Sequence, residues 1–163
     1  MRRIAVYPGT FDPVTHGHLD LANRARRHFD RLVVAILCNE DKQTTFSVDE
    51  RAELLREAVA PWENVAVDTF DGLLVEYVRR VGAAVIVRGI RAVTDFEYEM
   101  QMTMMNRKLD SSVETVFLMP SESYSYVSSR LVREIVRLGG SVAGLVPEKV
   151  EHALAQKLGP DSR

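Results

Sequence analysis

The sequence is poor in several features that would restrict its class at once. It has one cysteine, Cys38, in 163 residues, so no intrachain disulfide can form. No apolar run approaches the roughly 18 residues of a membrane span. The apolar part of the N-terminal segment MRRIAVYPG is too short for a secretory signal. These absences predict a cytoplasmic protein that does not bind a membrane.

The sequence also lacks an excess of positive charge. Its 21 lysine and arginine residues are outnumbered by 23 aspartate and glutamate residues, which gives a formal net charge of −2. A protein that binds a nucleic-acid backbone is usually basic overall. The charge balance therefore predicts no nucleic-acid partner, although basic residues can still cluster locally around a small anion.

Short apolar runs alternate with longer amphipathic stretches along the whole chain. Strands are expected at 4–9, 31–38, 64–70, 83–89 and 113–120, and helices at 18–29, 47–60, 72–81, 95–109, 127–139 and 147–158. This alternation predicts an α/β protein with a doubly wound, parallel five-stranded sheet, helices on both faces and C-terminal helices. We expect one domain over residues 1–158 and a flexible tail at 159–163.

The stretch YPGTFDPVTHGH, residues 7–18, follows the first expected strand. Gly9 can let the backbone approach a ligand, and Gly17 and His18 open a helix whose free N–H groups favour an anion. The residue pattern favours phosphate binding over a capped turn without a ligand. A metal site formed by His16 and His18 is a weaker alternative, because residues two apart on a helix point in different directions.

Two arginines follow the fourth expected strand, in VIVRGIRAVTDFEYE. Arg88 comes directly after a run that should be buried, and Arg91 follows three residues later. A guanidinium group at the carboxyl edge of a parallel sheet suits a phosphate. The alternative is a pair of surface salt bridges, with Glu97 or Glu99 as partners. The position of both arginines at the ligand-binding edge of the sheet favours phosphate binding over salt bridges.

Four further residues do not show a ligand-binding role by themselves. Ser128 and Ser129 begin a helix, where their hydroxyl groups can bind an anion or merely cap the helix. Lys42 lies in the polar loop NEDKQTTF and reads as a solvated charge. Leu74, in DGLLVEY, is as consistent with a position in the core as with a contact to a ligand. For the two serines the residue types favour anion binding and simple capping equally, whereas for Lys42 they favour a solvated charge.

Several segments together resemble a known family of enzymes. GTFDPVTHGH resembles the T/H-x-G-H signature of nucleotidyltransferases, with Thr15, Gly17 and His18 at the motif positions. Together with RGIRAVTDFEYEMQM, VFLMPS and VSSRLVREI, in this order, it makes nearly the whole sequence similar to bacterial phosphopantetheine adenylyltransferases. The resemblance implies a Rossmann-like fold and a reaction in which ATP and 4′-phosphopantetheine give dephospho-coenzyme A and pyrophosphate.

The resemblance also implies roles for individual residues of this sequence. The implied catalytic residues are Thr10, His18, Lys42 and Arg91. The implied ATP-binding residues are Thr10, Phe11, His18, Gly89, Ile90, Arg91, Glu99, Tyr124, Ser125, Tyr126, Val127, Ser128, Ser129 and Arg130, the last standing where many relatives have serine. The implied phosphopantetheine-binding residues are Thr10, Lys42, Leu74 and Arg88. No residue is expected to ligate a metal, and Mg²⁺ is expected to arrive with ATP.

The expected helix at 95–109 bears on the assembly of the chain. Four methionines crowd the expected helix at 95–109, where flexible core packing or a subunit contact is the expected role. The family resemblance implies a homohexamer, with this helix in the interface.

Two rival functions stand beside the one that the resemblance implies. One is a nucleotidyltransferase for nicotinamide mononucleotide or glycerol 3-phosphate, and the other is a nucleotide-binding regulatory module without turnover.

Overall fold

A computed structural model describes residues 3–38, 43–91 and 93–160. Within these ranges the strands are Ile4–Gly9 (β1), Arg31–Leu37 (β2), Val65–Phe70 (β3), Val85–Gly89 (β4) and Glu114–Leu118 (β5). The α-helices are His16–Ala25 (α1), Val48–Val59 (α2), Leu74–Arg80 (α3), Val93–Leu109 (α4), Ser129–Arg137 (α5) and Glu148–Leu158 (α6), and Glu122–Tyr124 forms a 3-10 turn (η1).

The strands pair in the order β3-β2-β1-β4-β5, and every pair is parallel. The predicted single-domain, five-stranded parallel sheet is therefore confirmed. Since strand order reverses on either side of β1, the carboxyl ends of β1 and β4 flank the point where open α/β sheets bind ligands. The segment after β1 and the two arginines after β4 consequently meet at one edge of the sheet.

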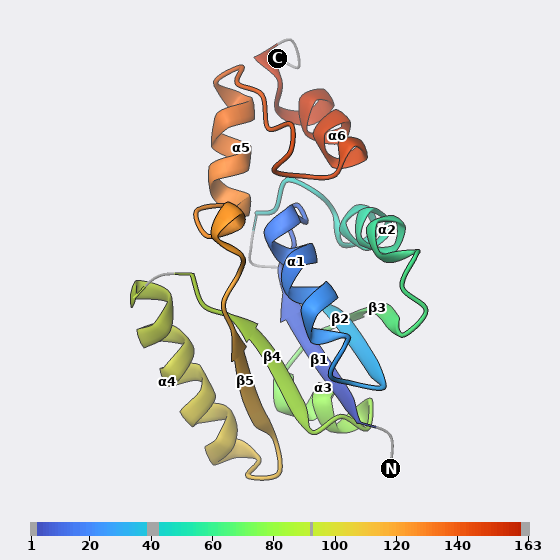
Figure 1. The fold of residues 1–163 in the computed structure, drawn as a ribbon, viewed down its shortest axis with the longest axis vertical. Helices are drawn as coiled ribbons and strands as arrows, with labels where there is room; N and C mark the ends of the chain where they lie inside the picture. The colour runs from blue at the N-terminus through green and yellow to red at the C-terminus, as the bar shows by residue number, and fades with distance from the viewer. Residues whose placement is uncertain (1–2, 39–42, 92, 161–163) are drawn as a thin grey trace.

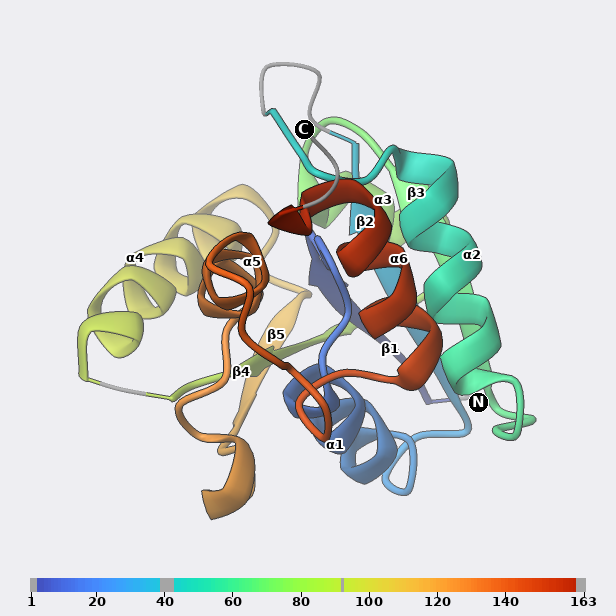
Figure 2. The same ribbon diagram turned by 90° about the horizontal axis from the view of Figure 1, so that it is seen from above.

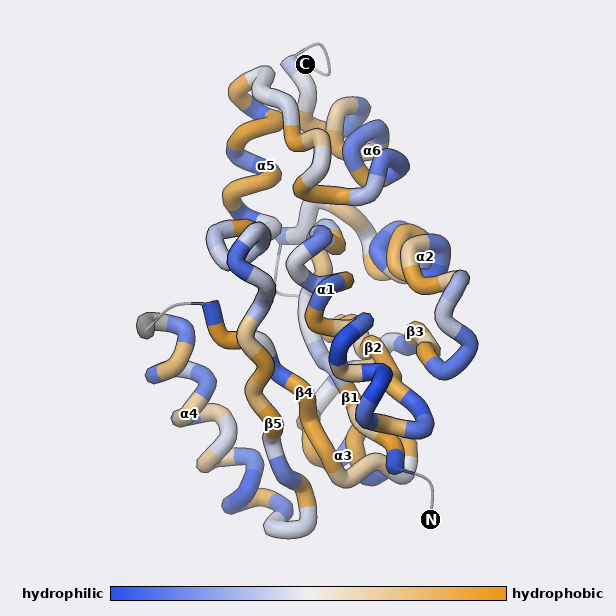
Figure 3. The backbone as a smooth tube through the Cα atoms, in the orientation of Figure 1, coloured by the Kyte–Doolittle hydropathy of each residue, from blue (hydrophilic) through white to orange (hydrophobic). Residues whose placement is uncertain are grey.

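Helices cover both faces of this sheet (Figures 1 and 2). Alternate residues of the strands point to opposite faces. Val34 of β2 joins a core with α1, α2, α5 and α6, whereas its neighbour Val33 joins a second core with α3. Figure 3 shows the central strands as a mostly apolar layer with polar residues on the surrounding helices. The alternation in the sequence thus reflects one sheet buried on both sides.

The element boundaries differ from expectation chiefly at α1. The helix expected at 18–29 begins two residues earlier, because Thr15 caps it, and ends at Ala25. Beyond Ala25 the chain makes short turns, with the backbone N–H of His28 donating to the Ala25 carbonyl at 2.9 Å. These turns bring the chain round into β2. The other boundaries lie within two residues of those expected.

The last two helices lie beyond the carboxyl edge of the sheet (Figure 1). The segment between α5 and α6 contacts the start of α1, where the backbone N–H of His16 donates to the Leu145 carbonyl at 2.8 Å. Residues 161–163 of the expected tail lie outside the described ranges. In the described parts of the chain, no helix has the length and apolar character that crossing a bilayer requires.

Candidate active site

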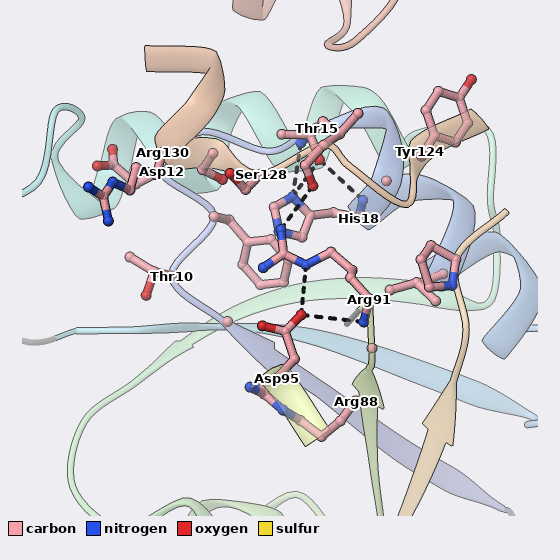
Figure 4. Close-up of a pocket in the computed structure, with 18 of the residues that line it drawn as sticks. Thr10, Asp12, Thr15, His18, Arg88, Arg91, Asp95, Tyr124, Ser128 and Arg130 are labelled. Atoms are coloured by element: carbon pink, nitrogen blue, oxygen red, sulfur yellow. Dashed lines mark hydrogen bonds and ion pairs between the residues drawn. The ribbon is translucent and has the colours of Figure 1, made fainter. Parts of the chain in front are cut away.

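A cavity of about 510 Å³ opens at the carboxyl ends of β1 and β4. The segment after β1, the start of α1, the segment after β4 and the start of α5 contribute its walls. Figure 4 shows Thr10, His18, Arg88, Arg91 and Ser128 around this space. The cavity therefore lies where strand order predicts a ligand, and it combines an imidazole with several guanidinium groups.

The chain turns sharply as it leaves β1. Phe11 has a φ of 49°, in the left-handed region that non-glycine residues seldom adopt. Its buried ring packs edge-on against Tyr7, at 5.4 Å between centroids, and against His18, at 5.0 Å. A Cβ atom at Gly9 would come within 2.9 Å of the Phe11 ring. Gly9 thus leaves room for the ring that supports the His18 imidazole.

Thr15 and His18 form a capping box at the start of α1. The backbone N–H of Thr15 donates to Nδ1 of His18 at 3.0 Å, and the backbone N–H of His18 donates to the Thr15 hydroxyl at 3.3 Å. Because a backbone N–H can only donate, Nδ1 must be unprotonated. The proton of the neutral ring is therefore on Nε2, which leaves His18 one N–H donor to offer to a ligand.

The electrostatic surroundings keep this ring neutral. Burial is the largest effect and, with the nearby positive charges of Arg91 and Arg88, lowers the pKa of His18 to about 4. Burial also raises the pKa of the neighbouring Tyr7 hydroxyl far above its usual range. At neutral pH both side chains are uncharged, and the positive charge of the site comes from its arginines.

We expect no loss of activity through protonation of His18 between pH 8 and 5. Its pKa is about 4 in the folded chain and 6.5 in the reference state. Its neutral form therefore stabilises the fold fully above pH 6.5, and that contribution is lost as the pH falls towards 4. Long-range ¹H–¹⁵N spectra should show the Nε2–H tautomer down to pH 5. A charged ring at pH 6 would contradict this prediction.

Arg88 is held at the cavity wall by Glu99 and by the backbone of β1. Its Nε donates to Glu99 Oε2 at 2.7 Å, its Nη2 donates to Glu99 Oε1, and its Nη1 donates to the Pro8 carbonyl at 2.9 Å. Burial acts to lower the pKa of Arg88, but the hydrogen bonds and charge of Glu99 outweigh it and raise the pKa. Two of the five guanidinium N–H groups remain for a ligand.

Arg91 links the segment after β4 to the segment before α5. Its Nε donates to Asp95 Oδ2 at 3.1 Å, and its Nη1 donates to the Val127 carbonyl at 3.0 Å. Figure 4 shows its guanidinium beside the His18 ring, with Asp95 adjacent. The salt bridge to Glu99 that was considered as an alternative to phosphate binding is thus present at Arg88. Arg91 pairs with Asp95, which was not among the expected partners, and both arginines also line the cavity.

The start of α5 is attached to the loop after β1. Ser128 caps the helix by accepting from the Leu131 N–H at 3.1 Å, and Ser129 Oγ donates to the Pro13 carbonyl at 2.7 Å. Arg133 Nη1 donates to the Asp12 carbonyl. The capping role is confirmed for Ser128, whereas Ser129 and Arg133 hold the start of α5 against the loop after β1 at the cavity.

The structure brings together most of the residues that the sequence implicated. The implicated residues that line the cavity are Thr10, Phe11, His18, Arg88, Gly89, Arg91, Glu99, Tyr124, Val127, Ser128, Ser129 and Arg130. Ile90, Ser125 and Tyr126 belong to the same segments but do not line it. Leu74 begins α3 and packs against the core on that face of the sheet. Lys42 lies outside the described residues, so its role stays a prediction.

Other residues line the cavity without having been implicated. They are Tyr7, Pro8, Asp12, Leu21, Gln43, Thr44, Asp95, Pro120 and Arg133, whereas the motif residues Gly9, Thr15 and Gly17 line the cavity as the sequence pattern led us to expect. Spacing could have revealed two of them, because Asp95 stands four residues after Arg91 and Arg133 one turn after Ser129. The contact of Asp12 with residues 45 and 46 carries no signal in the sequence.

Comparison with known proteins agrees with this geometry. A family model described as cytidylyltransferase-like matches residues 6–135. The phosphopantetheine adenylyltransferase of Caldanaerobacter subterraneus subsp. tengcongensis is 52% identical over 95% of this chain and 97% of the relative. That of Clostridium novyi is 48% identical over 96% and 98%, and that of Anaeromyxobacter sp. (strain K) is 53% identical over 100% and 99%. The chain therefore belongs to the phosphopantetheine adenylyltransferase family of nucleotidyltransferases.

Proposed function

We propose that the enzyme transfers the adenylyl group of ATP to 4′-phosphopantetheine, giving dephospho-coenzyme A and pyrophosphate in coenzyme A biosynthesis. The observation that carries the proposal is the single cavity wall on which a neutral His18 N–H donor and the guanidinium groups of Arg88 and Arg91 meet. Two polyanionic substrates need such positive groups to approach each other. The names of the relatives supply the identity of the acceptor.

The proposed reaction is a direct displacement at the α-phosphorus of ATP. A phosphate oxygen of 4′-phosphopantetheine forms a bond to this phosphorus while the bond to the bridging oxygen breaks, and pyrophosphate leaves with that oxygen. His18 donates its Nε2–H to an α-phosphate oxygen, where negative charge develops in the transition state. Thr10 orients the attacking oxygen from the start of the same loop.

The proposed division of labour places the two arginines on different substrates. Arg88, fixed by Glu99, binds the phosphate of 4′-phosphopantetheine with its remaining N–H groups. Arg91, together with the serine-rich start of α5, binds the phosphates of ATP. Lys42 would act with Arg88 on the acceptor, and Leu74 would contact the pantetheine arm. Substrate positioning then accounts for catalysis without a covalent intermediate.

We further propose that Mg²⁺ enters as part of the ATP complex. In the described ranges no group of three or more histidine, cysteine, aspartate or glutamate side chains is placed to hold a metal ion. The cavity carboxylates Asp12, Asp95 and Glu99 are each paired with an arginine. Mg²⁺ prefers phosphate oxygens and water to an all-protein cage, so the triphosphate is its natural source of ligands.

Pyrophosphate release tests the proposed reaction. We expect release from ATP to rise by at least about 10²-fold when 4′-phosphopantetheine is added, because the acceptor supplies the attacking oxygen. A coupled assay should therefore show one pyrophosphate for each dephospho-coenzyme A formed. Nicotinamide mononucleotide and glycerol 3-phosphate serve as acceptor controls, and faster release with either would replace the proposed acceptor. ATP binding without any release would support the regulatory-module alternative.

We propose that six copies of the chain assemble, with α4 in an interface. The methionines of α4 do not fill the core of the single chain, because Met100, Met102, Met104 and Met105 are 40% to 67% exposed. Phe96 and Leu109 extend this exposed apolar surface along the helix. Monomeric proteins rarely expose such a surface without a partner. The exposure of these methionines contradicts the core-packing interpretation and supports the proposed subunit contact.

Sedimentation velocity tests the assembly. We expect a species of six 18.4 kDa chains, about 110 kDa. Met104→Glu should shift the distribution to smaller species, since it places a charge on the most exposed methionine of α4. Lys108→Glu, which changes the charge of an exposed polar residue on the same helix, is the control. A wild-type protein that sediments as a monomer at micromolar concentration would contradict the proposal.

Two further parts of the proposal concern boundaries and location. We propose that residues 1–158 form one nucleotidyltransferase domain, because α6, the last helix of the described residues, ends at Leu158. We also propose a cytoplasmic location, in which the single free cysteine remains reduced.

A further inference from the structure

Arg51 is a buried cation outside the cavity wall. It lies in α2, and only 2% of its surface is exposed. Its Nη1 donates to the carbonyls of Thr10 at 2.8 Å and Leu37 at 3.5 Å, and its Nε donates to the carbonyls of Phe46 at 3.2 Å and Ser47 at 3.3 Å. Each of these acceptors is a backbone oxygen. Among the described residues, no carboxylate lies within ion-pair distance of this guanidinium.

Asp12 makes the complementary contacts between the same two segments. Its carboxylate, in a residue only 4% exposed, accepts from the backbone N–H groups of Thr45 at 2.8 Å and Phe46 at 2.9 Å. Arg51 therefore reaches from α2 to the loop after β1, and Asp12 reaches from that loop to the segment before α2. Three of these hydrogen bonds to main-chain groups join the two segments, two accepted by Asp12 and one donated by Arg51 to Thr10.

We propose that Arg51 and Asp12 form a loop clamp that positions the acceptor-binding side of the cavity. Gln43 and Thr44 line the cavity just before the clamped residues, and Thr10 lines it from the other segment. Arg51 is a positioning residue, because it touches the Thr10 backbone and contributes no atom to the cavity wall. The identification of this side with 4′-phosphopantetheine rests on the proposed function.

The chemistry of the guanidinium group explains why an arginine occupies this position. Its donors form a planar fork that can reach carbonyls of separate segments at once. An ammonium group carries the same charge on a single point. Burying a charged group is costly, and the hydrogen bonds to main-chain oxygens offset that cost. The loss of these bonds frees Thr10 to move, and a shift of about 1 Å at a reacting centre can lower a rate by about 10²-fold.

Steady-state kinetics of Arg51→Lys and Arg51→Gln test the clamp. We expect kcat/KM for 4′-phosphopantetheine to fall by about 10²-fold in Arg51→Gln and by a smaller factor in Arg51→Lys. The KM for ATP should change by less than about threefold, because Arg91 and the start of α5, which are proposed to bind the phosphates of ATP, make no hydrogen bond to Arg51. A lower kcat/KM for 4′-phosphopantetheine with a nearly unchanged KM for ATP would distinguish a positioning role of Arg51 from a general loss of structure.

Leu55→Ala is the matched control for stability. Leu55 lies in the same helix, is 1% exposed, and packs in the core without lining the cavity. We expect this variant to unfold at a lower temperature and to keep the wild-type kcat/KM in assays performed well below that temperature. Acceptor kinetics within threefold of wild type in both folded Arg51 variants, or an equal loss in Leu55→Ala, would overturn the proposal.

Amide hydrogen exchange gives a readout that does not depend on turnover. In Arg51→Lys we expect faster exchange in peptides covering 43–47, whose N–H groups at Thr45 and Phe46 donate to Asp12, with unchanged exchange in β1. This result would support the clamp even if the wild-type enzyme used another acceptor, in which case the proposed function alone would fail. Unchanged exchange across 43–47 would overturn the clamp whatever the acceptor.

Discussion

His18→Ala is expected to lower kcat by about 10²–10³-fold while changing the KM for ATP much less. The ring lies beside Arg91 and presents its Nε2–H to the cavity, because Nδ1 is occupied by the backbone N–H of Thr15. A donor aimed at charge that develops in the transition state contributes mainly to kcat, and the loss of one such donor typically costs this much. Single-turnover measurements with saturating ATP would isolate the chemical step.

His16→Ala is the matched control for this effect. His16 stands two residues earlier on the same helix, and its ring lies 5.9 Å from that of Tyr124 instead of lining the cavity. We expect this variant to retain kcat within about threefold of wild type. Equal losses in the two variants would show that the effect comes from the start of α1 as a whole. An unchanged kcat in His18→Ala would remove His18 from the proposed role.

Arg88→Ala is expected to raise the KM for 4′-phosphopantetheine by about 10- to 100-fold. Hydrogen bonds to charged groups contribute about 1.5–3 kcal/mol each, which corresponds to this range. The KM for ATP should rise less than about threefold, because Arg91 and the start of α5 are proposed to bind the nucleotide. Calorimetric titration of each substrate would measure both effects. A larger loss for ATP would mean that the roles of the two arginines are exchanged.

The interpretation of Arg88→Ala requires a control for the carboxylate that it leaves behind. Glu99 is only 9% exposed at its side chain, so removal of its partner leaves a buried charge and destabilises the fold. Arg79→Ala is comparable, because Asp110 is 8% exposed at its side chain and pairs with Arg79 at 2.6 Å away from the cavity. We expect Arg79→Ala to lower stability without changing either KM.

The order of the elements could be read from the sequence because each local pattern agrees with the global fold. Strands buried on both faces appear as continuous apolar runs, and each is followed by an amphipathic stretch of helical length. The capping box at Ser47 and Glu50 is visible as two residues three apart, and both of its hydrogen bonds are present. The box at Thr15 has no such signature in the sequence, because a histidine takes the place usually held by glutamate or glutamine.

The partners of charged side chains could not be read in the same way. Arg51 and Arg56 stand in one helical segment with similar neighbours, yet Arg51 is buried against four backbone carbonyls and Arg56 is exposed. The difference depends on the loop after β1, which is 41 residues away from Arg51 at Thr10. A helical pattern records which face is apolar, and it contains no information about a main-chain oxygen from a distant strand.

The sequence by itself determined the α/β class, the parallel sheet and the place of the ligand edge, because these depend on short-range periodicity and on residues adjacent to strand ends. Its motifs also identified the imidazole and both arginines of the cavity. Only the tertiary structure decided that His18 carries its proton on Nε2, that Glu99 holds Arg88, and that Arg51 joins two loops. Each of these depends on hydrogen-bond directions between atoms, which are established only when the chain is folded.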